Sequence, residues 1–240
     1  LLVLACKDKK DLKFEDLLDI YVKASRELEE NPGMEKEVFG ALKKFEEDDK
    51  ETINAFRRIV KICVKGQEGI LKKINCNYDT FDYESDYLSK GKVKEVLQAL
   101  DKTGKLFVDE ESRKVLDLRD YMKESPYLVL ARSDGTSLYP TRDIAYTLDK
   151  IRWAKDLNLI VLGEDQKLYF QQISAAIRLL GKEPPTSIHY SFVLLPSGKM
   201  STRKGEVVLL SDFFEEARSE AEREVKERYP DLEEGESQKR

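Results

Sequence analysis

Apolar positions in the first hundred residues recur at the spacing of α-helices. Residues three or four apart share one face of a helix, so each stripe predicts a helix that buries that face in a core. A turn at residues 31–33 should separate the first two helices, and Gly66 and Gly69 are candidate interruptions of a later one. The stripes are Phe14, Leu17, Leu18, Tyr21 and Leu28; Ile53, Phe56, Val60 and Cys63; and Val93, Val96, Leu97 and Leu100.

Short apolar runs replace the helical stripes from residue 106 onward. Residues 106–108, 114–118 and 127–130 have the composition of short strands. The dipeptide Asp134-Gly135 is a hairpin-turn signal, because glycine readily adopts a positive φ. We therefore expect a hairpin that returns residues 137–139 against residues 128–131.

Helices and strands alternate from residue 143. A helical stripe over residues 144–151 precedes a continuous apolar run at 159–162, which is typical of a buried strand in a parallel sheet. Asp165 is expected to cap the next helix, and Gly181 is the residue type that ends one. The core face of that helix should carry Tyr169, Ile173, Ala176, Ile177 and Leu180.

A second strand is predicted over residues 188–195 and a final helix over residues 212–228, with Asp212 and Glu215 as a capping box. This order of elements predicts an α/β fold with a βαβ unit, about half of a doubly wound sheet. Half a sheet would leave a strand edge and apolar surface exposed, so we expect self-association or poor solubility.

Composition and charge narrow the class of protein. Of 240 residues, 40% are hydrophobic. The net charge is −5, and residues 211–240 alone carry this charge, with 11 acidic and 6 basic side chains. A global basic surface for nucleic acid is therefore absent. No apolar run spans a bilayer, and residues 1–6 are too short for a signal peptide, so no membrane partner is expected. Three separated cysteines and one histidine predict reduced thiols, a cytoplasmic location and no zinc site.

Ligands of open α/β sheets bind beyond the carboxyl ends of the strands. Residues 163–166 and 196–205 occupy such corners. In the second, Lys199, Arg203 and Lys204 lie between two glycines, a composition that suits phosphate oxygens. A solvated surface loop explains the same composition, and the spacing is not that of a Walker A loop.

Tyr139 and Asp143 lie four residues apart near a predicted helix start. Asp143 could cap that helix, or it could pair with a cationic ligand that Tyr139 also contacts. His189 is interpreted as structural, because no Ser or Cys shows a nucleophile elbow. The acidic, aromatic residues 77–85 do not match a calcium loop and are expected to form a packed polar connector.

Taken together, these residues resemble a known family. Lys199-Met200-Ser201-Thr202-Arg203 resembles the KMSKS signature loop of class I aminoacyl-tRNA synthetases. Residues 133–146, 163–167 and 200–205 resemble arginyl-tRNA synthetase in order and spacing. The resemblance is dense over residues 125–217 and weaker over the earlier helices and residues 81–85. Three ordered motifs make it far more specific than one five-residue match.

The resemblance implies an α/β fold: the second half of a class I synthetase Rossmann-like nucleotide-binding fold, preceded by a helical connective region. Residues 1–105 would form that region, residues 106–210 the Rossmann-like half with the substrate hairpin and KMSKS-type loop, and residues 211–240 a helix and acidic tail. The implied activity is that of an aminoacyl-tRNA ligase, which activates L-arginine with ATP to arginyl-adenylate and ligates it to tRNA(Arg).

By position in the family's motifs, Asp143 would pair with the guanidinium of arginine, while Tyr139 and Gln166 would contact the same substrate. A loop of cations and hydroxyls would close over the ATP phosphates and stabilise the leaving pyrophosphate. Mg²⁺ is expected with ATP, bound mainly by phosphates and not by a metal site of the protein. The loop residues are Lys199, Met200, Ser201, Thr202, Arg203 and Lys204.

The sequence departs from the family pattern in two respects. Thr202 stands in place of the second lysine of KMSKS, and Arg203, Lys204 or another lysine is expected to compensate. With one histidine, the 240 residues hold no His-x-Gly-His, the HIGH motif of the ATP site. The helical domain that reads the anticodon is missing too. We therefore expect a piece of a catalytic domain that is inactive by itself.

Two other interpretations stay open. One is a free-standing, catalytically dead paralogue that binds arginine, nucleotide or a synthetase partner. The other is a different class I synthetase or a nucleotidyltransferase of similar fold. Tyr139, Asp143 and Gln166 together argue against the second, because they suit a cationic amino acid.

Overall fold

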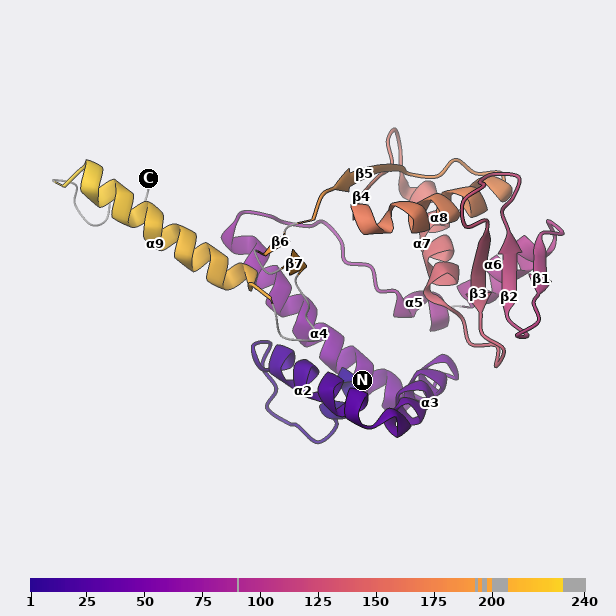
Figure 1. The fold of residues 1–240 in the computed structure, drawn as a ribbon, viewed down its shortest axis with the longest axis horizontal. Helices are drawn as coiled ribbons and strands as arrows, with labels where there is room; N and C mark the ends of the chain where they lie inside the picture. Colours follow the sequence, from indigo (N-terminus) through magenta and orange to yellow (C-terminus); the bar gives the residue numbers. More distant parts are fainter. Residues whose placement is uncertain (90, 193, 196–197, 200–206, 231–240) are drawn as a thin grey trace. The chain divides into compact units, whose positions relative to one another are not determined.

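The structure, a computed structural model, describes residues 1–89, 91–192, 194–195, 198–199 and 207–230 (Figure 1). The chain divides into two compact units, each drawn from separate parts of the sequence. The first unit takes Leu1–Val38, Ile53–Tyr78 and Leu194–Arg240, and the second takes Phe39–Thr52 and Asp79–Val193. The predicted boundaries at residues 105 and 210 instead divide the chain into three continuous segments, and this division stays a prediction.

An antiparallel sheet in the second unit confirms the three short strands. β1 (Leu106–Val108), β2 (Lys114–Asp117) and β3 (Tyr127–Ala131) pair in that order. Leu116 and Leu128 lie opposite each other and are buried, because alternate residues of a strand face the same side. Helices α6 (Lys92–Asp101) and α7 (Tyr139–Trp153) contribute Leu100 and Ile144 to the same core.

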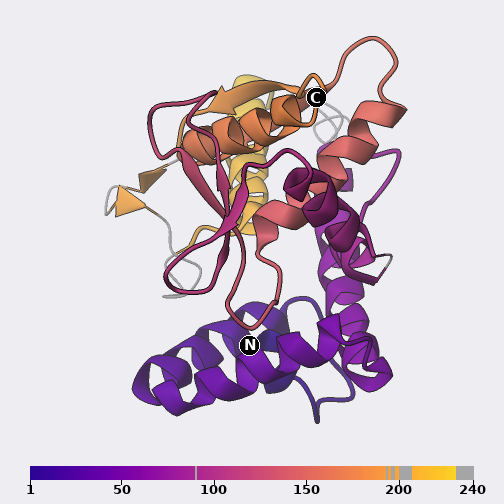
Figure 2. The same cartoon turned by 90° about the vertical axis from the view of Figure 1, so that its right-hand side faces the viewer.

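The predicted βαβ unit is present in the second unit. β4 (Leu159–Gly163), α8 (Lys167–Leu179) and β5 (Thr186–Tyr190) follow one another, and the two strands pair in parallel with Gly163 opposite Tyr190. α8 runs along one face of this pair (Figure 2), the face from which Ile160 and Leu162 pack against the core. Gly181, at φ +71°, lies just beyond the C-terminus of α8, as predicted.

The other face of β4 and β5 is exposed, which corrects the prediction of a fully buried strand. Val161 is 62% exposed and its partner Ile188 is 48% exposed. A parallel sheet is normally covered on both faces. β5 also ends at Tyr190, short of the predicted strand at 188–195, because β6 (Leu194–Leu195) pairs instead with β7 (Gly198–Lys199).

Helix α7 begins earlier than the hairpin pattern predicts. The turn at Asp134-Gly135 forms, with Gly135 at φ +85°, and the Leu138 N–H donates to the Leu130 carbonyl at 2.8 Å. Tyr139 already lies in the first turn of α7, so the returning segment ends one residue sooner. Pro140 favours this start, because a first-turn residue needs no N–H donor. Asp143 is therefore inside the helix and is not its N-cap.

Two further capping predictions are wrong. Asp165 lies in the 3₁₀ turn η2 (Glu164–Gln166), and the N-cap of α8 is Gln166. α9 (Leu210–Arg228) has Leu209 as its N-cap, and no side chain makes a capping hydrogen bond there. Asp212 lies in the first turn of α9, where its charge still interacts favourably with the helix dipole.

The first unit begins with α1 (Leu2–Ala5), α2 (Asp16–Glu30) and the 3₁₀ turn η1 (Pro32–Met34). The turn confirms the predicted break after the first long helix. α3 (Glu35–Glu46) starts in the first unit and ends in the second. α4 (Lys50–Lys73) is a single helix, so Gly66 and Gly69 do not interrupt it. A Cβ at Gly66 would overlap the ring of Phe14. Within the described residues, none of the helices is both long and apolar enough to span a membrane.

The two glycines of α4 should respond oppositely to alanine. Gly69→Ala places a methyl group in open space and should raise the free energy of unfolding by up to about 1 kcal/mol through helix propensity. Gly66→Ala should lower it by roughly 1–2 kcal/mol, because overpacking against Phe14 outweighs that gain. Urea unfolding of both variants measures the difference, and equal effects would contradict the packing of Phe14 on α4.

The exposed face of β4 and β5 should drive self-association of the 240-residue chain. Val161 and Ile188 lie opposite each other on that face, so replacing both with lysine should shift sedimentation from oligomer to monomer. Val108→Lys is the control, because Val108 is as exposed but lies on β1. A wild-type chain that sediments as a monomer at all concentrations would contradict the prediction.

Candidate active site

The N-terminal parts of α7 and α8 bring together three side chains, which we call the Asp143 cluster: Tyr139, Asp143 and Tyr169. Tyr139 and Asp143 are four residues apart on α7 and so share one face of the helix. Tyr169 comes from the first turn of α8. Its hydroxyl donates to Asp143 Oδ2, and its ring packs on Tyr139 with 4.9 Å between centroids.

Local packing fixes the position of α7. Thr141, between the two cluster residues of α7, is fully buried and donates from Oγ1 to the Leu130 carbonyl at 2.6 Å. Ile144 is also fully buried in the core. Because these side chains anchor the inner face of α7 to β3 and the core, the opposite face presents Tyr139 and Asp143 in a fixed orientation.

The electrostatic surroundings leave Asp143 short of positive charge. Partial burial raises the pKa of Asp143, the Tyr169 hydrogen bond lowers it, and the charge of Glu84 raises it again. Lys150 and Arg142 have smaller lowering effects. A carboxylate in this state gains from a further cation, which would favour its ionised form.

Tyr169 is held as a neutral hydrogen-bond donor. Burial and the neighbouring Asp143 both raise the pKa of its hydroxyl, so the group stays protonated at neutral pH. Lys150, on the same helix as Asp143, lies 4.5 Å above the ring of Tyr146. Burial lowers the pKa of Lys150, whereas the negative charges of Asp143 and Asp82 raise it by less.

Residues 77–84 of the predicted polar connector are exposed, so they are not packed as expected, but two of their side chains contact α7. Asp82 Oδ2 accepts a hydrogen bond of 3.0 Å from the Tyr146 hydroxyl, and Glu84 pairs with Arg142. The short helix α5 (Ser85–Ser89) follows and places the Tyr87 ring 5.5 Å from that of Tyr146. The connector thereby brings the negative charge of Glu84 close to Asp143.

Arg142 joins three segments of the second unit. Its Nη1 donates to the carbonyl and hydroxyl oxygens of Ser137 at 3.1 and 3.0 Å and lies 3.9 Å from Glu46. Glu46, at the end of α3, in turn accepts from the backbone N–H of Ser137 at 3.3 Å. The side chains of Arg142 and Glu46 are only 12% and 15% exposed, so this network is well shielded from water.

The other predicted residues are placed apart from the Asp143 cluster or lie outside the described chain. Gln166 is exposed in η2, with its Nε2 at 3.4 Å from Asp165 Oδ2, and the described contacts do not join it to Tyr139 or Asp143. Lys199 belongs to β7. The rest of the predicted phosphate loop, Met200, Ser201, Thr202, Arg203 and Lys204, lies outside the described residues.

The lone histidine forms local contacts. His189 contacts Ser187 Oγ at 3.1 Å and the Gly163 carbonyl at 3.5 Å, in keeping with the structural interpretation. In the part of the chain that the structure describes, no group of three or more His, Cys, Asp or Glu side chains could hold a metal ion.

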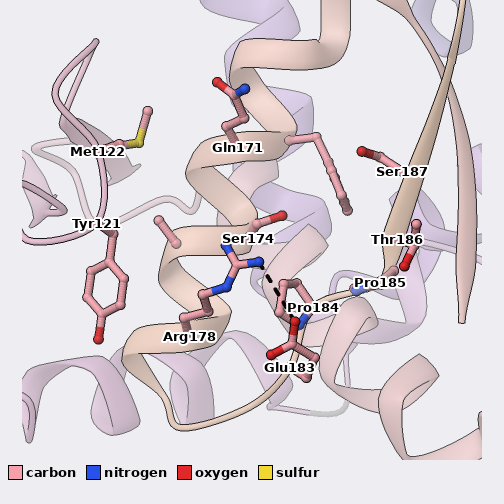
Figure 3. Close-up of a pocket in the computed structure, with 12 residues that line it drawn as sticks. Tyr121, Met122, Gln171, Ser174, Arg178, Glu183, Pro184, Pro185, Thr186 and Ser187 are labelled. Carbon is pink, nitrogen blue, oxygen red and sulfur yellow. Dashed lines mark ion pairs between the residues drawn. The ribbon is translucent and has the colours of Figure 1, made fainter.

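A cavity of about 610 Å³ lies beside α8, and Figure 3 shows the residues that line it. Gln171, Ser174 and Arg178 of α8 line it together with Thr186 and Ser187 from the start of β5. The guanidinium of Arg178 lies 3.8 Å from the Glu183 carboxylate. None of the residues predicted for substrate lines this cavity.

Sequence reasoning missed Tyr169, Glu84 and Arg142 as parts of the site. Tyr169 was expected only on the core face of its helix. One signal was available, because a tyrosine on an apolar helix face needs a partner for its hydroxyl. Nothing in the spacing of Glu84 and Arg142, which are 58 residues apart, indicates that they meet.

Comparison with known proteins decides the family. A sequence model described as "tRNA synthetases class I (R), catalytic domain" matches residues 4–240. The chain belongs to this family. It is similar to the arginine--tRNA ligase of Methanococcus aeolicus, with 40% identity over 223 residues, and to that of Methanocaldococcus jannaschii, with 39% over 226. The resemblance seen in the sequence motifs is thus confirmed.

These matches cover most of the chain but less than half of each relative. The two arginine--tRNA ligases are matched over 91% and 92% of this chain and over 38% and 39% of their own length. The chain therefore spans about two fifths of the curated relatives it matches.

Solved structures support the same fold. Thermus thermophilus arginyl-tRNA synthetase matches with a TM-score of 0.72 and 22% identity, over 97% of this chain and 46% of that one. Arginyl-tRNA synthetase from Plasmodium falciparum matches with a TM-score of 0.67 and 17% identity, over 94% and 36%. The predicted α/β class I synthetase fold is confirmed.

The Arg142 network should carry stability that depends on pH. Arg142→Met removes the cation that opposes the burial-raised pKa of Glu46, so that pKa should rise further. Glu46 is then ionised in the unfolded chain at pH values where the folded state disfavours its charge. The loss in free energy of unfolding should therefore be smallest near about pH 4, where it comes from the lost hydrogen bonds to Ser137, and should grow by about 1 kcal/mol by about pH 7.

Urea unfolding at several pH values measures this loss. Arg152→Met is the matched control, because Arg152 also lies on α7 and pairs with Asp149 at 3.1 Å but is 66% exposed. An exposed pair contributes less than about 1 kcal/mol. Equal losses for the two variants, or a loss for Arg142→Met that shrinks as pH rises, would contradict the role of the network.

Proposed function

We propose that this chain forms part of an arginine--tRNA ligase, which activates L-arginine with ATP to arginyl-adenylate and transfers the arginyl group to tRNA(Arg). The observation that carries the proposal is the Asp143 cluster. A partly buried carboxylate, oriented by one neutral hydroxyl and lined by an aromatic ring, suits a planar cation that can donate two parallel N–H bonds.

The guanidinium of arginine has these properties. Asp143 would pair with its N–H groups, while the exposed ring of Tyr139 offers a face for stacking or a hydroxyl contact. Gln166, at the carboxyl end of β4 in the turn before α8, would contact another part of the amino acid. Ligands of α/β folds bind at such strand ends.

The phosphate chemistry is assigned to the loop that begins at Lys199. Lys199, Arg203 and Lys204 would draw charge from the ATP phosphates as pyrophosphate leaves, and Met200, Ser201 and Thr202 complete the same loop. This catalysis is electrostatic and positional and needs no proton transfer by a side chain. Mg²⁺ would be held mainly by the phosphate oxygens of ATP.

The role of Asp143 is tested by Asp143→Asn in the native protein at its full natural length. The amide keeps the shape of the side chain but loses its charge, so the KM for arginine in ATP–pyrophosphate exchange should rise about a hundredfold or more. The KM for ATP should change little, because Asp143 would touch only the amino acid.

Asp149→Asn provides the control on the same helix. Asp149 pairs with Arg152 and lies outside the Asp143 cluster, so the KM for arginine should stay unchanged. Equal losses of arginine and ATP recognition in Asp143→Asn would overturn the assigned role. Arginine binding without any pyrophosphate exchange in the wild type would favour a binding paralogue over a ligase.

A further inference from the structure

The Tyr169 hydroxyl is the donor on which the Asp143 carboxylate depends. We propose that Tyr169 is a positioning residue for the substrate guanidinium: it orients the Asp143 carboxylate across the gap between α8 and α7 and leaves its negative charge intact. This inference rests on the proposed function, since it concerns how the same site recognises arginine.

The geometry gives Tyr169 two points of attachment. Its hydroxyl donates to Asp143 Oδ2, and its ring packs on Tyr139 at 4.9 Å. A carboxylate offers about four acceptor positions on its two oxygens. Tyr169 takes one of them, which leaves both oxygens able to accept from a guanidinium that donates two parallel N–H bonds.

The charged neighbours of Asp143 are engaged elsewhere. Arg142 pairs with Glu84 and hydrogen-bonds Ser137, and Lys150 lies over the ring of Tyr146. Glu84, which approaches from the connector, adds negative charge near Asp143. Among the described residues, Tyr169 is therefore the only side chain with a recorded hydrogen bond to Asp143.

A neutral donor has a consequence that a cationic donor would not. Lysine or arginine in the place of Tyr169 would orient the carboxylate and also neutralise it, so a cationic substrate would gain little. The Tyr169 hydroxyl orients the group while the full charge remains for the ligand. It also lowers the pKa of Asp143, opposing burial and Glu84, and so keeps the carboxylate ionised.

Tyr169→Phe tests the inference in the native protein at full natural length, because it keeps the ring against Tyr139 and removes only the hydroxyl. At about pH 6.5 the KM for arginine in pyrophosphate exchange should rise about tenfold to a hundredfold. The KM for ATP should not change. Without the hydroxyl the pKa of Asp143 should rise, so any part of the arginine defect that comes from protonation of Asp143 should shrink as the pH increases.

Tyr146→Phe is the matched control. Tyr146 also donates to a carboxylate, Asp82 at 3.0 Å, but not to Asp143. Loss of the Tyr146 hydroxyl should leave the KM for arginine and its pH profile unchanged, because water can replace the donor to the exposed Asp82.

Each outcome decides the inference. An unchanged KM for arginine in Tyr169→Phe, or a rise that is the same at every pH and accompanied by a rise in the KM for ATP, would overturn it. If Asp143→Asn loses arginine recognition while Tyr169→Phe does not, the proposed function stands and only the positioning role fails. If neither variant affects arginine, the assigned site itself fails.

Discussion

The partial burial of the Asp143 carboxylate is the constraint on which the rest of the site depends. Removing a carboxylate from water costs free energy unless hydrogen bonds or opposite charges compensate. Here the compensation is incomplete, because one hydroxyl donates to Asp143 while the nearest cations are engaged with other partners. The raised pKa of Asp143 records this shortfall. A bound cation would remove this shortfall, so partial burial favours the proposed binding of a guanidinium.

That constraint holds only if the two helices keep their positions. α7 is fixed by the buried Thr141, whose hydroxyl reaches the Leu130 carbonyl of β3, and α8 by Ile173 and Ile177, which are buried in the same core. A densely packed core permits only small shifts. The hydrogen bond between Tyr169 and Asp143 therefore forms at little cost in conformational entropy, because the core already holds both helix backbones in place.

Local signals in the sequence predicted the elements better than the surroundings of the site. The turn at Gly135 and the helix stop at Gly181 formed as expected, because a positive φ at glycine is a property of the residue itself. The prediction that residues 159–162 are buried was wrong for one face of the strand, because an apolar run does not indicate which face is covered. The caps expected of Asp143, Asp165 and Asp212 were also wrong, because helix starts depend on the residues before them.

The residues of the site divide in the same way. Tyr139 and Asp143 could be proposed from the sequence because they lie in one motif, four residues apart. Tyr169 and Glu84 were missed, because they meet Asp143 and Arg142 across 26 and 58 residues of chain. Such contacts follow from tertiary packing and leave no period in the sequence. The phosphate loop was identified by motif alone, and most of it lies outside the described residues.

Two tyrosine–carboxylate pairs each involve one residue of α7, and they differ in the burial of the carboxylate. Tyr146 donates to Asp82, and burial together with Asp82 raises the pKa of Tyr146 to about 12, so both tyrosines are neutral donors. The acceptors differ. Asp82 is exposed, so water can fill its remaining acceptor positions, whereas Asp143 is partly buried and less accessible to water. A ligand gains free energy where water cannot already satisfy the carboxylate. Burial of the acceptor, not the presence of a tyrosine, therefore distinguishes Asp143 and supports its proposed role in recognition.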